Sequence, residues 1–212
     1  MTTLILVRHG FSVANAERRL AGVTDFELSP IGFKQAELVG KYIYQNFKVD
    51  AIYSSDMTRA CQTAAPAAEL FSLPIIKNKE FRELYVGDWE GMAYTDIAEQ
   101  YPTEFLVWKN DHAHSRTPNG ESVREVYERV CPAILKTVKE NPDKCILIVS
   151  HATSIRSFKS MVDTGSFEGI SDIKVPNAAI NVFDINDNGN VTTVLSNYTG
   201  HIEHLPKTEI LT

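Results

Sequence analysis

The sequence has few of the features that mark secreted, membrane-spanning or metal-stapled proteins. Its 212 residues include only three cysteines, Cys61, Cys131 and Cys145, and their odd number and wide spacing disfavour a disulfide framework or a zinc site. No stretch approaches the roughly 18 apolar residues of a membrane span. The N-terminus has no basic segment before an apolar run, so no secretory signal is expected. We expect a cytoplasmic protein with reduced cysteines that does not bind membranes.

The sequence also has no excess of positive charge and no sign of internal division. Its formal net charge is −6, which argues against nucleic acid as the main partner. Repeats, low-complexity tracts and linkers rich in proline, serine or glycine are all missing. With 43% hydrophobic residues, the chain can bury one full core. We therefore expect a single domain over residues 1–212.

Apolar runs and helical periodicity alternate along the chain. They predict strands at 4–7, 51–54, 73–77 and 145–149, and helices at 30–46, 58–71, 123–138 and 154–164. Two later strands, 179–185 and 191–196, flank Asn186-Asp187-Asn188-Gly189, which is typical of a hairpin turn. This order predicts an α/β protein, a three-layer sandwich with a mostly parallel central sheet, flanking helices and one late antiparallel hairpin.

Helix boundaries can be assigned in part from capping residues and prolines. Ser29 followed by Pro30 favours a helix start, and Asp56 is a candidate cap for the helix at 58–71. Pro66 is expected to strain or shorten that helix. Pro132 is expected to bend the helix that Ser122 opens, or to remove a hydrogen bond from it.

The strand at 4–7 is followed at once by Arg8, His9 and Gly10. In open α/β sheets, ligands bind beyond the carboxyl ends of the strands, so these side chains are expected in a crevice. Arginine offers a planar fork for phosphate, and histidine can attack as neutral imidazole or transfer a proton near neutral pH. The alternative interpretation is a buried strand that ends in a salt-bridging arginine and a capping histidine.

Two other strand ends and one loop supply the partners that such a histidine needs. The strand at 51–54 leads to Arg59, and the strand at 145–149 leads to His151. Glu83 lies on an intervening loop, in the segment RELYVGDWEG. Two histidines and two arginines at strand ends, with one carboxylate between them, form a coherent set for phosphoryl transfer.

This order of motifs resembles the histidine phosphatase superfamily, which includes the cofactor-dependent phosphoglycerate mutases. The resemblance extends from Leu4 to about Arg156. Besides LILVRHG and SSDMTRA, it takes in Gly22, the segment DFELSPIG, Gln35-Ala36 and Gln62-Thr63-Ala64. It implies the same α/β sandwich that the element order predicts.

The resemblance implies a role for each residue of the set. His9 would be the nucleophile and form a phosphohistidine, and Gly10 would let the backbone turn sharply beside it. Arg8 and Arg59 would bind the phosphoryl oxygens, and His151 would donate to the same oxygens.

Four further residues are assigned less directly. Asn15 would be an additional phosphoryl donor, and Gly22 and Ala152 are expected to contact substrate. Glu83 would protonate the leaving alkoxide and then accept a proton from water. Glu90 is the rival carboxylate, and the residues alone do not choose between the two, whereas the family pattern places the acid at Glu83.

Other charged residues have two interpretations each. His112 with His114, and His201 with His204, have spacings that are weak metal signals, and we expect exposed surface histidines. His112 or Arg116 would touch substrate if their loop overhangs the crevice. Three further arginines either bind a second anionic group of the substrate or are simply solvated: Arg18, Arg19 and Arg82.

The prediction is a metal-independent histidine phosphatase of the acid type, without a cofactor, that hydrolyses small phosphate esters. A phosphoglycerate mutase is the first alternative, but between Glu83 and Glu121 the chain has only Lys109 and Arg116 as permanent cations. Such mutases carry a longer, more basic insertion there. A non-catalytic phosphate-binding module is the second alternative, although a binding protein would not need the acid. The sequence does not decide whether the protein forms a homodimer.

Overall fold

The computed structural model describes residues 1–208 and contains one six-stranded sheet. The strands are β1 (Thr2–Arg8), β2 (Ala51–Ser54), β3 (Ile75–Lys77), β4 (Cys145–Ser150), β5 (Ile180–Ile185) and β6 (Val191–Tyr198), in the order β3-β2-β4-β1-β5-β6. Strands β1 to β4 pair in parallel, whereas β5 pairs antiparallel with both β1 and β6. The mostly parallel sheet with a late hairpin is thereby confirmed.

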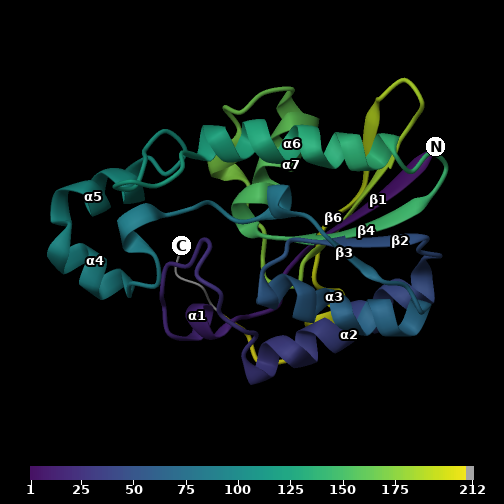
Figure 1. The fold of residues 1–212 in the computed structure, drawn as a ribbon, viewed down its shortest axis with the longest axis horizontal. Helices are drawn as coiled ribbons and strands as arrows, with labels where there is room; N and C mark the ends of the chain where they lie inside the picture. The colour runs from purple at the N-terminus through teal and green to yellow at the C-terminus, as the bar shows by residue number, and fades with distance from the viewer. Residues whose placement is uncertain (209–212) are drawn as a thin grey trace.

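Four long helices cover the two faces of the sheet (Figure 1). Helices α2 (Pro30–Asn46) and α3 (Thr58–Phe71) pack together on one face, and α6 (Val123–Lys139) and α7 (Ala152–Thr164) pack together on the other. The predicted three layers are therefore present. In the described residues 1–208, none of the helices is long and apolar enough to cross a membrane.

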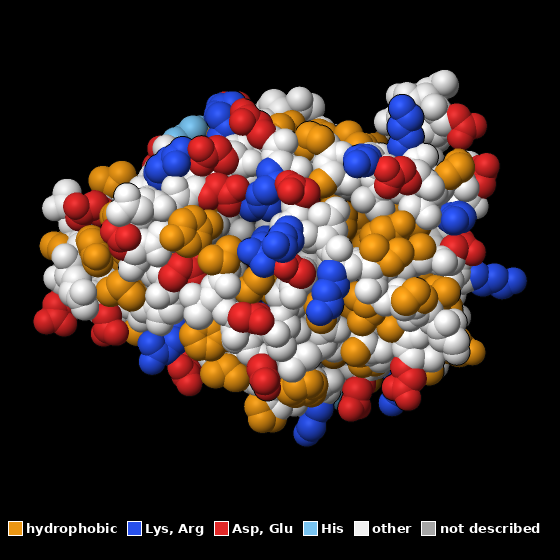
Figure 2. Space-filling model, in the orientation of Figure 1, with side chains coloured by type: hydrophobic (Ala, Val, Ile, Leu, Met, Phe, Trp, Pro, Cys, Tyr) orange, Lys and Arg blue, Asp and Glu red, His pale blue; other side chains and the backbone are white. Residues whose placement is uncertain are grey.

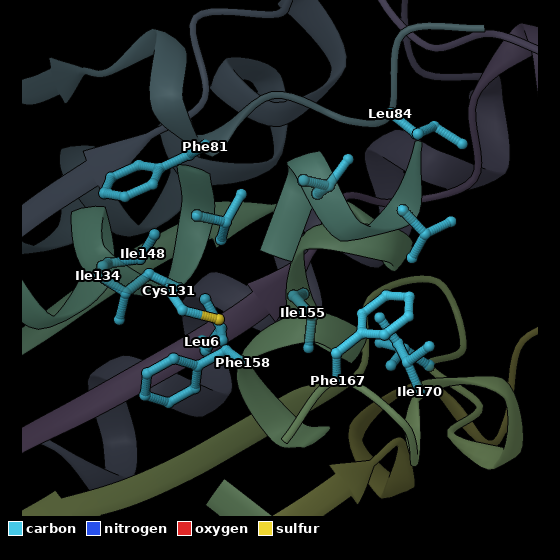
Figure 3. Packing of buried hydrophobic residues seen from close by; sticks show 14 of the residues in the cluster. Leu6, Phe81, Leu84, Cys131, Ile134, Ile148, Ile155, Phe158, Phe167 and Ile170 are labelled. Carbon is cyan, nitrogen blue, oxygen red and sulfur yellow. The ribbon is translucent and has the colours of Figure 1, made fainter. Parts of the chain in front are cut away.

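Alternate side chains of the central strands form two separate cores. On β1, Leu4 and Leu6 belong to the core with α6 and α7, and Ile5 and Val7 belong to the core with α2 and α3. Figure 3 shows Leu6 and Phe158 within the first of these cores. A strand that is buried on both faces reads as a continuous apolar run, which is why it stands out in the sequence.

The helix starting at Thr58 is capped by a residue distant in sequence, so the prediction of an Asp56 cap is wrong. The residue before the helix is Met57, whose side chain makes no capping bond. Instead, Asp25 accepts from the backbone N–H of Thr58 at 2.7 Å and from its hydroxyl. Asp56 accepts two hydrogen bonds from Arg82.

The two internal prolines interrupt neither helix. Helix α3 runs through Pro66, so the expected shortening does not occur, and α6 runs through Pro132. The first turn of α6 is held by a capping box in which Ser122 and Glu125 satisfy each other's backbone N–H groups. Strand β3 begins at Ile75 and not at residue 73, and α7 begins at Ala152, directly after His151.

Three short helices were not predicted from the sequence. Helix α1 (Val13–Ala16) follows the loop after β1, and α4 (Tyr94–Gln100) and α5 (Pro102–Asn110) lie beyond the end of the sheet where β1 and β4 finish (Figure 1). Helix α5 buries none of its residues completely, so its pattern carries no clear apolar stripe. Single 3₁₀ turns lie at Lys79–Phe81, Gly87–Trp89, Ile170–Asp172 and Gly200–Ile202.

The connections after β1 and β4 leave the sheet in opposite directions. The chain after β1 leads to α2 on one face, and the chain after β4 leads to α7 on the other. Because β1 and β4 are neighbours, this divergence opens a crevice at their carboxyl ends. Arg8 and His9 lie on one side of that opening, and His151 lies on the other.

Candidate active site

A crevice of about 410 Å³ lies at the carboxyl ends of β1 and β4. Its walls include five residues singled out in the sequence: Arg8, His9, Asn15, Arg59 and Glu83. Gly22 and Ala152 also line it. His151 lies behind them, with its ring centroid 5.1 Å from that of His9. The structure therefore brings the whole predicted set together from four separate segments.

The ring of His9 is fixed by the backbone of the next residue, Gly10. Its Nδ1 lies 2.7 Å from the carbonyl oxygen of Gly10, so Nδ1 carries the proton and donates it to that carbonyl. This arrangement leaves Nε2 with a free lone pair. Burial lowers the pKa of His9 well below 6.5, and Arg59 and Arg8 lower it further. His9 is therefore a neutral imidazole whose outer nitrogen can act as a nucleophile.

Gly10 is needed for close packing and not for a sharp turn, which corrects the expectation. Its φ is not in the left-handed region that glycine favours. A Cβ at this position would lie 2.7 Å from the carbonyl oxygen of Gly32 in α2. Its N–H donates to Thr63 Oγ1 at 3.0 Å. The loop that carries His9 is thus pressed against α2 and tied to α3.

His151 is held by Ser55, a residue to which the sequence analysis gave no role. The Nε2 atom of His151 lies 2.9 Å from Ser55 Oγ, which also accepts from the N–H of Met57 at 3.4 Å. In the described residues the Ser55 hydroxyl has no acceptor other than Nε2, so it donates to Nε2 and the proton of His151 resides on Nδ1. That buried Nδ1 has no partner in the described residues. Burial lowers the pKa of His151 well below 6.5, and the positive charge of Arg59 lowers it further.

The two arginines supply fixed positive charge. Arg8 Nη1 donates to the carbonyl of Val175 at 2.6 Å, and its buried Nε has no partner in residues 1–208. Burial lowers the pKa of Arg8 to about 10, so it stays a cation at neutral pH. Arg59 Nη2 donates to the carbonyl of Gly22 at 2.7 Å, and Nη1 donates to that of Thr24 at 3.1 Å.

Glu90 anchors the loop that Arg59 contacts. Its carboxylate accepts from the backbone N–H groups of Val23 at 2.9 Å, Thr24 at 2.8 Å and Val86 at 3.1 Å. Gly22 begins this loop, and a Cβ there would lie 1.9 Å from the carbonyl oxygen of Leu84. With its oxygens committed to backbone donors, Glu90 is suited to a structural role.

Glu83 is the only carboxylate among the crevice residues that the structure describes. It accepts from the N–H of Leu84 at 2.8 Å and from the N–H of Thr153 at 3.2 Å. The second bond comes from the first turn of α7, next to Ala152 and two residues after His151. Glu83 is therefore positioned by the same helix start as His151, on a wall that a bound ester would face.

The side-chain oxygen of Asn15 is already hydrogen-bonded, so its amide nitrogen is the group that faces the crevice. Its Oδ1 accepts from the N–H of Ser12 at 3.1 Å and from Asn177 Nδ2 at 3.3 Å. The Nδ2 group is therefore the part of the amide left for a ligand. Asn177 also donates to the carbonyl of His9 at 3.0 Å, so one buried amide aligns both residues.

The remaining candidate arginines lie in different surroundings. Arg18 is exposed and does not line the crevice, whereas Arg19 lines it and pairs with Glu17. Arg82 pairs with Asp56 at 2.6 Å, and Arg116 pairs with Glu125 at 2.8 Å. Both of these pairs lie outside the crevice.

Two of the four candidate metal histidines are not exposed, which corrects the sequence-based expectation. His112 is partly buried and lines the crevice, because α4 and α5 carry its loop over the site. His201 is partly buried against Tyr42 and Tyr198. His114 and His204 are exposed. Within residues 1–208, no three His, Cys, Asp or Glu side chains are grouped so as to hold a metal.

The crevice is strongly cationic although the protein is acidic. Among residues 1–208, six lysine or arginine side chains and one carboxylate, that of Glu83, line it. Elsewhere the charges are mixed, and Figure 2 shows acidic and basic side chains interspersed on the face that it displays. A positive crevice with low-dielectric walls can attract anions whatever the net charge of the molecule.

Several crevice residues were missed from the sequence: Tyr94, Trp108, Arg156, Ser171 and Lys174. Most come from the short helices and loops around α4, α5 and 170–172, which carry weak periodic signals. Arg156 could have been found, because it lies four positions after Ala152 on α7. Residues i and i+4 share one face of a helix, so a crevice residue at 152 implies another at 156.

The neutral, buried histidines predict that the protein loses stability in acid. The pKa values of His9 and His151 lie well below 6.5, and that of His112 is about 4, in each case chiefly through burial. Below pH 6.5 the unfolded chain takes up protons that the folded protein does not. Each such histidine therefore lowers the free energy of unfolding at about pH 5 by on the order of 2 kcal/mol relative to neutral pH.

Urea unfolding at about pH 7.5 and about pH 5 measures this effect. His9→Gln should lose less stability between the two pH values than the wild type, because it has one buried histidine fewer. Asn141→Ala is the control, since it removes a buried amide that lies outside the crevice and does not titrate, and its deficit should be equal at both pH values. An unchanged pH dependence in His9→Gln would show that folding does not lower the pKa of His9.

The site agrees with what comparison with known proteins shows. The model of the histidine phosphatase superfamily (branch 1) matches residues 4–198. Phosphoserine phosphatase 1 of Hydrogenobacter thermophilus is 32% identical, over 95% of this chain and 95% of its own. Phosphoglycerate mutase-like protein 4 of Arabidopsis thaliana is 29% identical, over 98% of this chain and 89% of its own. The structure of Bacillus stearothermophilus YhfR superposes with a TM-score of 0.88 at 27% identity, over 96% of this chain and 100% of its own. The predicted resemblance is confirmed, and the chain belongs to the histidine phosphatase superfamily.

Proposed function

We propose that the protein is a phosphomonoesterase that hydrolyses small phosphorylated metabolites through a phosphohistidine on His9. The observation that carries this proposal is the neutral His9 ring, with Nδ1 committed to the Gly10 carbonyl and Nε2 free. A phosphate monoester carries about two negative charges, so an uncharged nucleophile meets less repulsion than an anion would. Family membership, and the phosphatase names among the relatives, support the same reaction.

In the proposed complex, the phosphoryl group sits among donors that are already in place. Arg8 and Arg59 supply permanent positive charge. The unpartnered Nδ1–H of His151 and the Nδ2 group of Asn15 supply further hydrogen bonds. Such preorganised donors stabilise the charge that spreads over the oxygens in the transition state.

The reaction proceeds in two displacements at phosphorus. His9 Nε2 forms a bond to phosphorus while the ester P–O bond breaks, and Glu83 gives its proton to the departing oxygen. Water then forms the new P–O bond while the P–N bond breaks, with Glu83 accepting the proton of the water. Phosphate leaves, and His9 and Glu83 return to their initial states.

Hydrolysis is favoured over a mutase reaction by the segment between Glu83 and Glu121, where the mutases carry a longer, more basic insertion. Of the two cations between Glu83 and Glu121, only Lys109 lines the crevice, because Arg116 pairs with Glu125 elsewhere. We propose no metal requirement, since arginines meet the phosphoryl charge.

We also propose a cytoplasmic location for the protein. Its three cysteines are free thiols, and burial raises the pKa of Cys131 to about 12 and that of Cys145 to about 11. Thiols with such pKa values remain protonated and react slowly with oxidants. They behave as core residues, which suits a reducing compartment.

The phosphohistidine is tested by a rapid quench in alkaline detergent with a substrate labelled in its phosphoryl group, in the presence of EDTA. Wild type should retain label in a form that is stable to base and lost in acid. His9→Ala should retain none and should show no turnover, because it has no nucleophile. His114→Ala, which removes an exposed histidine outside the crevice, should label normally. Normal turnover in His9→Ala would refute the proposal, and label appearing in a bisphosphorylated product would indicate a mutase.

The role of Glu83 is tested by the dependence of rate on the leaving group. Glu83→Gln should lose about 10²–10⁴-fold on alkyl phosphates, whose alkoxides need a proton, and much less on p-nitrophenyl phosphate. Glu90→Gln is the matched control, because Glu90 binds backbone N–H groups of the Gly22 loop. It should affect both substrates by similar factors. Equal losses on both substrates in Glu83→Gln would assign Glu83 a structural role instead.

A further inference from the structure

Arg129 on α6 uses every N–H group of its guanidinium. Its Nε and Nη2 donate to the two carboxylate oxygens of Glu121, at 2.9 and 2.8 Å. Its Nη1 donates to the carbonyls of Glu80 at 2.8 Å and Arg82 at 3.1 Å, and Nη2 also donates to the carbonyl of Glu83 at 3.3 Å. An arginine carries five such donors in a rigid planar fork, so all of them are satisfied here. Three of the bonds go to the backbone of the segment that carries Glu83.

These bonds hold the peptide groups on both sides of Glu83. The carbonyl of Arg82 belongs to the peptide group before Glu83, and the carbonyl of Glu83 belongs to the peptide group after it. Ser154 Oγ on α7 also donates to the Arg82 carbonyl, at 2.7 Å. Because each peptide group is planar, holding both of them fixes the backbone of Glu83 and the direction of its Cα–Cβ bond. That direction decides where the carboxylate meets a bound ester.

The apolar neighbours of Glu83 hold the same segment in the core. Phe81 and Leu84 are buried in the core that β1 shares with α6 and α7, and Figure 3 shows both side chains. Ser150 Oγ donates to the carbonyl of Phe81 at 2.7 Å. Apolar packing is not directional, so it keeps the segment against the core without fixing the orientation of its peptide groups. The guanidinium of Arg129 supplies that directional part.

Arg129 itself lies outside the crevice. Among residues 1–208, it lines a neighbouring open groove of about 530 Å³, and Glu83 is the residue that lines both the groove and the crevice. Its partner Glu121 also accepts from the N–H of Tyr85 at 3.2 Å, and the N–H of Glu121 donates to the carbonyl of Tyr85 at 2.7 Å. An effect of Arg129 on a substrate in the crevice therefore passes through the segment of Glu83.

We propose that Arg129, held by Glu121, is the positioning residue of the general acid and sets the direction from which Glu83 protonates the leaving oxygen. The proposal rests on the phosphomonoesterase function argued above. Proton transfer needs the two heavy atoms within about 2.6–3.2 Å of each other, so a small shift of Glu83 weakens it. Lysine has a single nitrogen on a flexible stem, so it cannot bind the same set of acceptors as the planar fork of arginine.

The test measures kcat/KM of Arg129→Lys on alkyl phosphates and on p-nitrophenyl phosphate. This constant covers the steps up to release of the alcohol, so the later attack of water does not enter it. Arg129→Lys should lose about 10²-fold on alkyl phosphates, as for a catalytic group displaced by about 1 Å, and much less on p-nitrophenyl phosphate. Arg116→Lys is the matched control, because in residues 1–208 Arg116 lines the same groove and pairs with Glu125 but makes no hydrogen bond to residues 80–83. Both of its constants should equal those of wild type.

A double variant separates positioning from a general loosening of the fold. Arg129→Lys combined with Glu83→Gln should lose no more on alkyl phosphates than Glu83→Gln alone, because no acid is left to position. Losses that multiply, or equal losses on both kinds of ester in Arg129→Lys, would overturn the proposal. If Arg129→Lys does not fold, Glu121→Gln is judged by the same criteria, since it replaces one acceptor of the fork by an amide NH₂ group.

A readout without turnover keeps this proposal distinct from the phosphatase function. If wild type hydrolyses no ester, the phosphatase function fails, and amide hydrogen exchange followed by NMR still tests the positioning. The N–H groups of Leu84 and Thr153 bind the Glu83 carboxylate, so they should exchange about 2- to 10-fold faster in Arg129→Lys than in wild type or Arg116→Lys. Equal exchange in all three proteins would show that Arg129 does not position Glu83.

Discussion

The structure depends on keeping His9 uncharged while it lies among cations. A histidine next to Arg8 and Arg59 in a buried crevice gains nothing from protonation, and burial lowers its pKa before the arginines do so further. The hydrogen bond from Nδ1 to the Gly10 carbonyl then decides which nitrogen keeps the proton. Burial and the two arginines therefore set the charge of the nucleophile, and the hydrogen bond to Gly10 sets its tautomer and orientation.

Much of the surrounding fold serves to hold that interaction. Thr63 of α3 binds the N–H of Gly10, α2 closes against Gly10 so tightly that no Cβ fits, and Asn177 binds the carbonyl of His9. These contacts come from three different segments of the chain. The loop after β1 is thus fixed by contacts from three segments. The two histidines stay neutral because they are buried, and backbone carbonyls accept hydrogen bonds from the two arginines.

The sequence predicts the central sheet and the residues at its strand ends well, because strands buried on both faces leave continuous apolar runs. His9, Arg59 and His151 could be found since each follows such a run. What lies over the crevice could not be predicted in the same way. Helices α4 and α5 are short and carry no clear apolar stripe, so Tyr94 and Trp108 had no recognisable signal.

Contacts between segments that are distant in the sequence could not be predicted either. The cap of α3 comes from Asp25, far away in sequence, and Ser55 acquires a role only because β2 and β4 are neighbours in the sheet. The residues alone did not distinguish Glu83 from Glu90, and only the family pattern placed the acid at Glu83. They differ in the structure because Glu90 is committed to the backbone of the Gly22 loop, whereas Glu83 lies at the start of α7.

The most direct measurement of the central claim is nitrogen-15 NMR of the histidine rings in the resting enzyme near neutral pH. With His9 assigned by its loss in His9→Gln, the account predicts a neutral ring with the proton on Nδ1 and an unprotonated Nε2. Addition of substrate, or of a phosphoryl donor, should then shift the Nε2 resonance. A doubly protonated ring, or a neutral ring with its proton on Nε2, would contradict the account, because neither form has a lone pair at the nitrogen that faces the substrate.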